Sequence, residues 1–247
     1  MDDERVGRWL RALEERHLAN LTASEVGRAL RALSSCYVER RGKLVTGGAL
    51  DSAGKRAAFA LFYAPLHFLV LREVVRAIPG APGVSAVTDL GCGTGAAGAA
   101  WVLECERCTV QGVDRNAWAV AEAQWTYRTL EVNGRAVKGD LHRANLAAAP
   151  TRAVLAAYTV NELSDPDRAA LLPRLLDAHE DGARILIVEP IARRMAGWWG
   201  GWERAFAAAG GESREWRFAV PLPERQRKLG RAAGLDPREL TARSLWL

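Results

Sequence analysis

The sequence has few of the residues that crosslink a chain and no run that marks a membrane span. Its four cysteines, among 247 residues, are too few and too scattered for a disulfide framework. It has no stretch of about 18 apolar residues, and the best candidate, residues 57–70, contains His67 and is expected to be a buried core helix. The acidic start (MDDER) leads into no apolar segment, so we expect no secretory signal and a cytoplasmic protein that does not bind membranes.

Lysine is also scarce, with 4 Lys against 30 Arg. Basic residues number 34 and acidic residues 29, which gives a net charge of +5, but no block of five basic residues occurs. The densest basic groups are residues 193–194 and 225–228. This balance permits contact with a polyanion without demonstrating it. The length and the 49% hydrophobic content are enough for one large core without a metal or crosslink.

The hydrophobic pattern divides the chain at residue 83. Residues 1–83 show helical spacing and predict an N-terminal helical cap, including a long helix over 53–78 that Pro65 should kink. Residues 84–247 alternate strands and helices, which predicts a doubly wound, mostly parallel α/β sheet of seven strands. The predicted strands are 85–90, 108–113, 135–138, 153–160, 184–189, 214–220 and 239–246, the last two more polar and suited to an antiparallel sheet edge. The predicted helices of this part are 95–105, 116–131, 166–178, 192–209 and 223–233.

Ligands of such folds bind beyond the carboxyl ends of the strands, and a glycine-rich segment follows the first one. It reads DLGCGTG over residues 89–95. Glycines at 91, 93 and 95 let the backbone turn tightly and let a ligand approach without Cβ atoms in the way. The helix that begins after them offers free backbone N–H groups.

Three interpretations of this segment remain. It is a plain turn; it is a dinucleotide site, because Gly91-x-Gly93-x-x-Ala96 satisfies that fingerprint; or it binds a cationic ligand. Asp89 would oppose a pyrophosphate and suits the ammonium and sulfonium groups of S-adenosylmethionine. We therefore favour the third interpretation.

Acidic and polar side chains follow the later strands. Asp114 ends the second strand, 19 residues after Gly95, where a carboxylate can accept hydrogen bonds from both ribose hydroxyls or cap the next helix. Asn161 and Glu162 follow the fourth strand and could position a nucleophile or accept its proton, although Glu162 could equally cap a helix. Glu189 ends the fifth strand at the same rim.

The segment DLGCGTG resembles the first motif of class I S-adenosylmethionine-dependent methyltransferases. The stretches RAAFALFYAPLH (56–67), YTVNEL (158–163) and VEP (188–190) are similar to the ribosomal small-subunit methyltransferase-like family, over roughly residues 50–195. The chain departs from that family in two places. Arg152 stands where the family has an acid, and no cysteine follows Met195 to form the family's iron–sulfur cluster. The single CxxC at 105–108 cannot complete a four-thiolate site, so we expect no metal.

The resemblance implies S-adenosylmethionine as the cofactor. In the family, an acid and the apolar residue after it contact the exocyclic amine and the face of adenine. Asp140 and Leu141 stand at these positions here. Trp118 is a further candidate to cover the adenine ring. The predicted cofactor-binding residues are Asp89, Gly91, Cys92, Gly93, Gly95, Asp114, Arg115, Asp140, Leu141 and Tyr158.

The predicted reaction is methyl transfer to a nitrogen or oxygen nucleophile. The candidate catalytic residues are Asn161, Glu162, Tyr63 and His67, the last two from the helical cap. Dispersed arginines and a covering cap favour a compact, small-molecule acceptor. The alternatives are a ribosomal RNA methyltransferase and a catalytically silent, cofactor-binding ribosome-assembly factor. An NAD-dependent oxidoreductase is disfavoured by Asp89, and the oligomeric state stays open.

Overall fold

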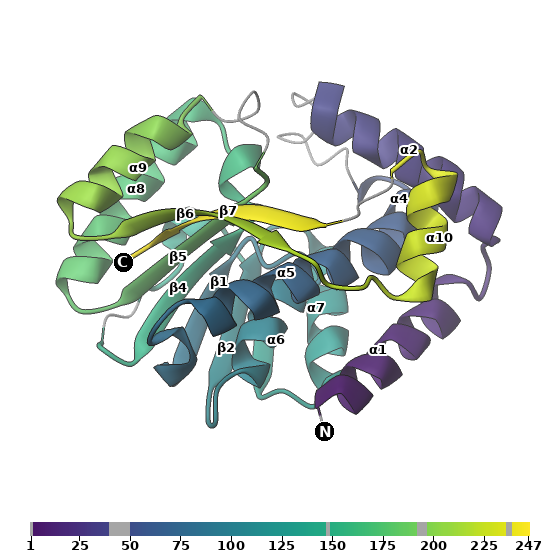
Figure 1. Ribbon diagram of the computed structural model, residues 1–247, viewed down its shortest axis with the longest axis horizontal. Helices are drawn as coiled ribbons and strands as arrows, with labels where there is room; N and C mark the ends of the chain where they lie inside the picture. The colour runs from purple at the N-terminus through teal and green to yellow at the C-terminus, as the bar shows by residue number, and fades with distance from the viewer. Residues whose placement is uncertain (1, 40–49, 147–148, 192–196, 236–238) are drawn as a thin grey trace.

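The computed structural model describes residues 2–39, 50–146, 149–191, 197–235 and 239–247. They form one seven-stranded sheet in the order β3-β2-β1-β4-β5-β7-β6 (Figure 1). Strands β1 to β5 are parallel, whereas β7 runs antiparallel to both β5 and β6. The predicted α/β class, the seven strands and the antiparallel edge are therefore confirmed. The strands are β1 Ala86–Leu90, β2 Thr109–Asp114, β3 Gly134–Lys138, β4 Arg152–Ala157, β5 Arg184–Glu189, β6 Glu212–Phe218 and β7 Leu240–Trp246.

Helices cover the sheet on both faces. Helices α5 (Ala64–Ala77), α6 (Ala96–Leu103) and α7 (Ala117–Thr129) lie on one side, and α8 (Asp165–Glu180) and α9 (Trp199–Ala208) lie on the other (Figure 1). Strand β5 is buried from Ile185 to Glu189, as its unbroken apolar run predicts. The predicted beginning of α9 at residue 192 lies outside the described residues.

A single helical rod, interrupted by a π turn, runs over residues 53–77. It consists of α4 (Ala53–Ala58), a π-helical turn (Phe59–Tyr63) and α5. Where a kink at Pro65 was expected, the N–H of Ala64 bonds to the carbonyl of Phe59, and this wider turn accommodates the proline that follows. The rod is long and apolar enough to cross a membrane, and 67% of its most apolar window is buried within the molecule.

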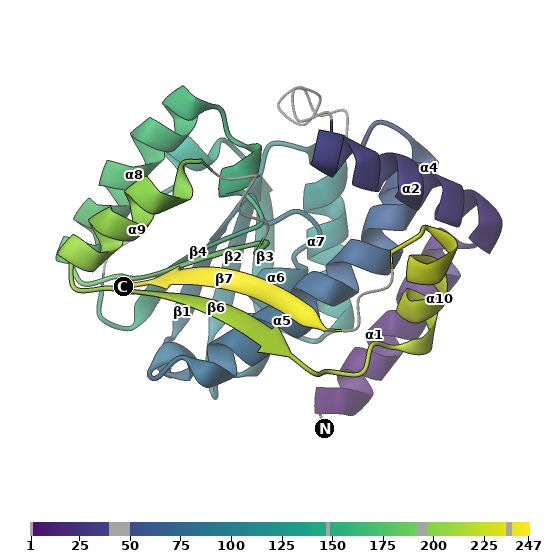
Figure 2. The same cartoon turned by 45° about the horizontal axis from the view of Figure 1, so that its top comes forward.

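The cap helices pack around this rod. They are α1 (Asp2–His17), α2 (Ala23–Glu39) and, from the far end of the chain, α10 (Glu224–Ala232) (Figure 2). Trp9 of α1 is fully buried, with its ring centroid 5.3 Å from that of Phe68. The buried side chains of the cap and of one sheet face form one continuous cluster.

One predicted boundary is wrong by three residues. Strand β4 was expected to reach residue 160 but ends at Ala157. Tyr158 takes a left-handed backbone conformation with φ of 58°, which an extended strand cannot contain. The chain then turns through Val160–Glu162, so the polar residues after β4 lie above the end of the sheet.

Candidate functional site

The glycine loop between β1 and α6 has left-handed backbone at each of its three glycines. The φ angles are 66° at Gly91, 52° at Gly93 and 76° at Gly95. A Cβ on Gly91 would lie 2.5 Å from Thr159, and one on Gly95 would also clash with protein. Among the described residues, a Cβ on Gly93 would meet only the ring of Phe59, at 3.8 Å. Gly93 is therefore the position at which the loop is open to a ligand.

Asp114 lies against this loop. Its Oδ2 accepts a hydrogen bond from the Gly93 N–H at 3.0 Å, and its Oδ1 accepts one from the Asn116 N–H at 2.8 Å. Asn116 caps α7, since its side chain accepts from the N–H groups of Trp118 and Ala119. Asn116, and not Asp114, is thus the N-cap of α7. The half-buried Asp114 carboxylate lies against the glycine loop instead. Arg115, next in the chain, is exposed.

Asp89 and Cys92 lie behind the loop. Asp89 is 1% exposed and accepts a hydrogen bond from the Gly98 N–H of α6 at 3.2 Å. Burial raises the pKa of Asp89 to about 8, helped by the Asp114 charge and opposed by the Gly98 N–H. Burial also raises the pKa of the Cys92 thiol. Both side chains support the loop from below, and their contact with a cofactor stays a prediction.

An aromatic wall stands beside the open loop. Phe59, Tyr63 and His67 share one face of the rod at four-residue spacing. The His67 ring stacks on the Tyr158 ring, with the ring centroids 3.7 Å apart and the ring planes at 10° to each other. Burial lowers the pKa of His67 to about 3, so its imidazole is neutral, and burial raises the pKa of Tyr63. Sequence reasoning singled out Tyr63 and His67 but missed Phe59, although its spacing from them was visible.

A buried carboxyl group that is hydrogen-bonded to Asn161 lies beyond the wall. Glu189 is fully buried and accepts from the backbone N–H of Asn161 at 3.0 Å and from its side-chain amide at 2.6 Å. The indole N–H of Trp198 donates to Asn161 Oδ1 at 3.0 Å. Burial raises the pKa of Glu189 to about 8, and the Glu162 charge adds to the rise. Asn161 is thus held by protein groups at both ends of its amide.

Glu162 follows Asn161 in the chain and is not the cap of α8. Ser164 caps α8 by accepting from the Asp167 N–H. Burial raises the pKa of Glu162 to about 7, the Asp114 charge raises it further, and Arg115 opposes both. Glu162 is therefore close enough to Asp114 for the two charges to interact.

Asp140 and Leu141 follow β3, beside Asp114. The Gly139 N–H bonds to the carbonyl of Asp114 at 3.0 Å, and Asp140 caps a short turn by accepting from the His142 N–H at 2.9 Å. Leu141 packs against the core under α8. Their predicted contact with adenine stays a prediction.

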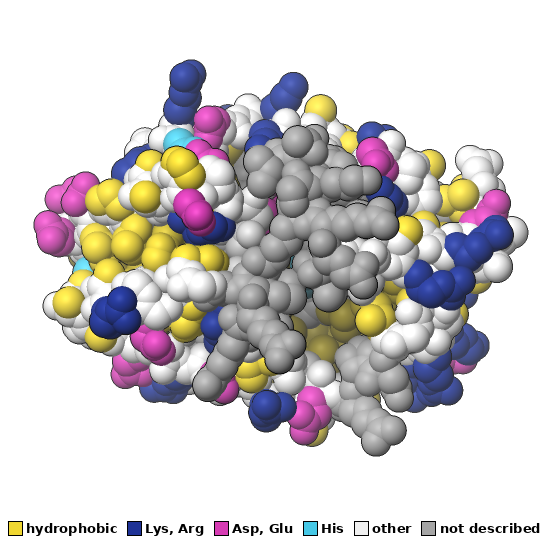
Figure 3. Space-filling view, turned by 90° about the horizontal axis from the view of Figure 1, so that it is seen from above, with side chains coloured by type: hydrophobic (Ala, Val, Ile, Leu, Met, Phe, Trp, Pro, Cys, Tyr) yellow, Lys and Arg dark blue, Asp and Glu magenta, His cyan; other side chains and the backbone are white. Residues whose placement is uncertain are grey.

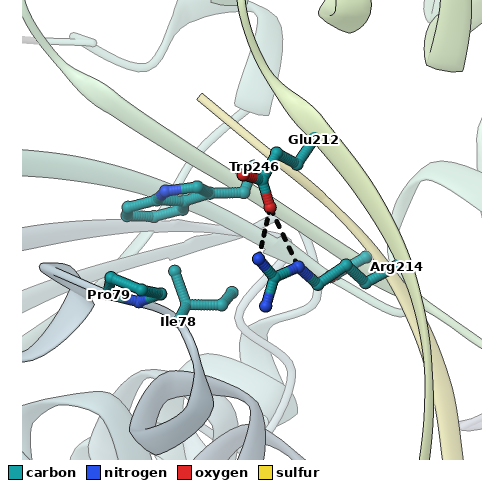
Figure 4. Close-up of a pocket in the computed structure, with 6 residues that line it drawn as sticks. Ile78, Pro79, Glu212, Arg214 and Trp246 are labelled. Carbon is teal, nitrogen blue, oxygen red and sulfur yellow. Dashed lines mark hydrogen bonds and ion pairs between the residues drawn. The ribbon is translucent and has the colours of Figure 1, made fainter.

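A separate small pocket of about 120 Å³ lies between the end of α5 and the β6–β7 edge (Figure 4). In it, Arg214 pairs with Glu212 next to Trp246. Trp246 pairs with Leu186, near the beginning of β5, whereas the carboxyl end of β5 pairs with Arg243 at the other end of β7. This pocket is therefore distinct from the site above. No cluster of three metal-ligating side chains occurs among the described residues.

Comparison with known proteins identifies the domain. Residues 87–182 match the family described as "Methyltransferase domain". The fold is similar to that of mitomycin 7-O-methyltransferase MmcR (14% identity, TM-score 0.56, covering 96% of this chain and 71% of that one). It is also similar to magnesium protoporphyrin IX methyltransferase from Synechocystis PCC 6803 with bound S-adenosylmethionine (14% identity, TM-score 0.51, covering 92% of this chain and 97% of that one). No curated protein matches the sequence. Residues 87–182 are thus a methyltransferase domain, its glycine loop is open at Gly93 and an acid follows β2, and S-adenosylmethionine is the cofactor of such a domain.

Proposed function

We propose that this methyltransferase acts on a nitrogen or oxygen nucleophile of a compact, small-molecule acceptor. The observation that carries the proposal is the composition of the site around Gly93. It combines aromatic side chains from the cap with two carboxyl groups, Glu162 and Glu189, that have pKa values of about 7 and about 8.

The loop and Asp114 hold the cofactor in this proposal. S-adenosylmethionine, when bound, supplies a methyl group on a sulfonium centre. The bare Cα of Gly93 allows close approach, and the Asp114 carboxylate accepts from ribose hydroxyls with the lone pairs that Gly93 and Asn116 leave free. The other cofactor contacts stay predictions, at Asp89, Gly91, Cys92, Gly95, Arg115, Asp140, Leu141 and Tyr158.

Glu162 takes the proton that the nucleophile loses. A general base works best when its pKa lies near the working pH, and the Glu162 value of about 7 meets that condition. Neutral His67 is too weak a base and, with Tyr63 and Tyr158, forms a wall that orients the acceptor. Asn161 fixes Glu189, and so the turn that carries Glu162.

The charges around the site favour a neutral or cationic acceptor over RNA. The Asp114 carboxylate lies against the loop, where a phosphate would have to approach it, whereas Glu189, with its pKa raised to about 8, is mostly uncharged near neutral pH. On the face seen in Figure 3, the Lys and Arg side chains of the described residues are dispersed and form no continuous stripe. The similar folds named above act on mitomycin and magnesium protoporphyrin IX, which are compact acceptors. The free thiols of the described cysteines support a reducing, cytoplasmic location.

Two measurements test the proposal. Calorimetry should show binding of S-adenosylmethionine and its homocysteine product and none of NAD. Incubation of a cell extract with methyl-tritiated cofactor should place label in the small-molecule fraction. Label in ribosomal RNA, or RNA binding that falls steeply between about 50 and 200 mM salt, would instead support an RNA acceptor. Cofactor binding with no transfer in any fraction would support a silent assembly factor.

A further inference from the structure

Helix α1 of the cap is joined to α7 at two places. Near its beginning, Arg8 pairs with Glu131, just beyond the end of α7, at 3.2 Å. In its last turn, Arg16 and His17 both bind Glu122, in the middle of α7. The Glu122 joint is thus nearer than the Glu131 joint to the beginning of α7. Helix α7 begins directly after Asp114 and Asn116.

The Glu122 joint is buried. The Glu122 side chain is 1% exposed, and its Oε1 lies 2.7 Å from His17 Nε2. Arg16 Nε donates to both carboxylate oxygens, at 3.1 and 3.2 Å. A carboxylate at this depth is costly unless it is paired, so the interior of α7 depends on these two residues of the cap. By contrast, the Glu131 side chain is 61% exposed.

Trp118 lies one turn before Glu122 on α7 and contacts the same part of the cap. The His17 ring meets the Trp118 ring edge-on, with centroids 6.4 Å apart, and the Arg56 guanidinium lies 5.7 Å from the Trp118 ring. Arg56 is one turn before Phe59, the side chain that faces Gly93. Trp118 is therefore enclosed by α1, α4 and the first turn of α7.

That first turn is bonded to the cofactor side of the site. Asp114 accepts from the Asn116 N–H, and Asn116 accepts from the N–H of Trp118. A shift of Trp118 would move the cap residue Asn116 and, with it, the carboxylate that lies against the glycine loop. The chain of contacts runs from α1 through Glu122 and Trp118 to Asp114.

We propose that Arg16 and His17, acting through Glu122, are positioning residues for the cofactor. They hold Trp118 and the beginning of α7 so that the Trp118 ring and the Asp114 carboxylate bound the adenosine half of S-adenosylmethionine. This inference rests on the role proposed for Asp114. It makes the N-terminal cap part of the cofactor site, and cofactor binding in turn strengthens the α1–α7 joint.

The test compares two isosteric variants of the full chain. Glu122→Gln removes the buried charge near the site, and Glu131→Gln removes the exposed charge at the other α1–α7 joint. Calorimetry measures the Kd for S-adenosylhomocysteine, and calorimetric melting gives the Tm of the ligand-free protein. We expect Glu122→Gln to raise the Kd about tenfold and Glu131→Gln to leave it within about twofold. Trp118→Ala should raise the Kd similarly, and Trp118→Phe should restore most of the affinity.

The outcomes separate the inference from the function. A lower ligand-free Tm with unchanged Kd in Glu122→Gln would make the joint merely structural and overturn the inference, as would full affinity in Trp118→Ala or equal losses in Glu122→Gln and Glu131→Gln. If Glu122→Gln does not fold, Arg16→Gln and His17→Gln are judged by the same Kd and Tm. Failure of the wild-type protein to bind the cofactor at all would overturn the proposed function instead.

Discussion

At the scale of single residues, the site depends on what Gly93 lacks. Its left-handed φ of 52° strains any side chain, and a Cβ there points toward Phe59 and not into packed protein. The three loop glycines thus differ: a Cβ at Gly91 or Gly95 would clash with protein, and Gly93 is the position that we propose faces the ligand.

Gly93→Val should abolish binding of S-adenosylmethionine, because its branched side chain occupies the approach to the loop. The control is Gly83→Val, since a Cβ on the exposed Gly83 meets no atom within 4 Å. Calorimetry of both variants, with circular dichroism to establish folding, decides the matter. Full affinity in a folded Gly93→Val protein would reduce the loop to a turn.

Asp114→Ala should weaken cofactor binding by about 1.5–3 kcal/mol, the range for losing charge-assisted hydrogen bonds. The Kd for S-adenosylhomocysteine measures this loss. An unchanged Kd in the folded variant would remove Asp114 from the ribose role.

Two buried acids and the half-buried Glu162 make stability depend on pH. The pKa values of Asp89, Glu162 and Glu189 are raised to about 8, 7 and 8, so the folded state holds protons that the unfolded state has released. The free energy of unfolding should therefore fall as pH rises from about 4.5 to about 8. Urea unfolding at pH 6 and pH 8.5 measures the fall, which Asp89→Asn should make smaller. An equal fall in that variant would mean that Asp89 ionises normally.

At the scale of elements, the sequence left open which residues cap the helices, and the structure identifies them. Ser164 caps α8 and Asn116 caps α7, which relieves Glu162 and Asp114 of those roles. The strands were predictable because β-branched runs alternate with alanine-rich segments. The end of β4 was not, because the left-handed Tyr158 depends on its stack with His67, 91 residues earlier in the chain.

The two caps should behave differently on removal. Ser164→Ala and Asn116→Ala should each lower the free energy of unfolding by about 1 kcal/mol. Asn116→Ala alone should also weaken cofactor binding, because Asp114 is bonded to the backbone of Asn116 at the beginning of α7. Urea unfolding and calorimetry on both variants measure the difference. Equal affinity in the two would show that the order of this turn does not reach the site.

At the scale of the molecule, the sequence predicted the sheet and placed the site at its carboxyl edge. It could not predict that Asp89 lies behind the glycine loop or that Glu122 joins the cap to α7. The second fact depends on a contact between residues about a hundred positions apart, His17 and Glu122. Periodicity reports which face of an element is buried, but not which partner buries it.

The cap over residues 1–83 should not unfold separately. Its buried side chains belong to the same cluster as those of the sheet, so heating should give one transition by both far-ultraviolet circular dichroism and tryptophan fluorescence. Two transitions would show that the predicted division at residue 83 separates independent domains.

The position of α10 has a consequence for synthesis of the protein. Its Gln226 donates to the carbonyl of Leu61 in the π turn at 2.8 Å, and Ala232 packs beside Gly27 of α2. Helix α2 and the π turn therefore gain these neighbours only when residues 224–232 have been made. Until then, part of the apolar surface around Leu61 and α2 stays uncovered, so a nascent chain that stalls late is more exposed to chaperones and proteases than its length suggests.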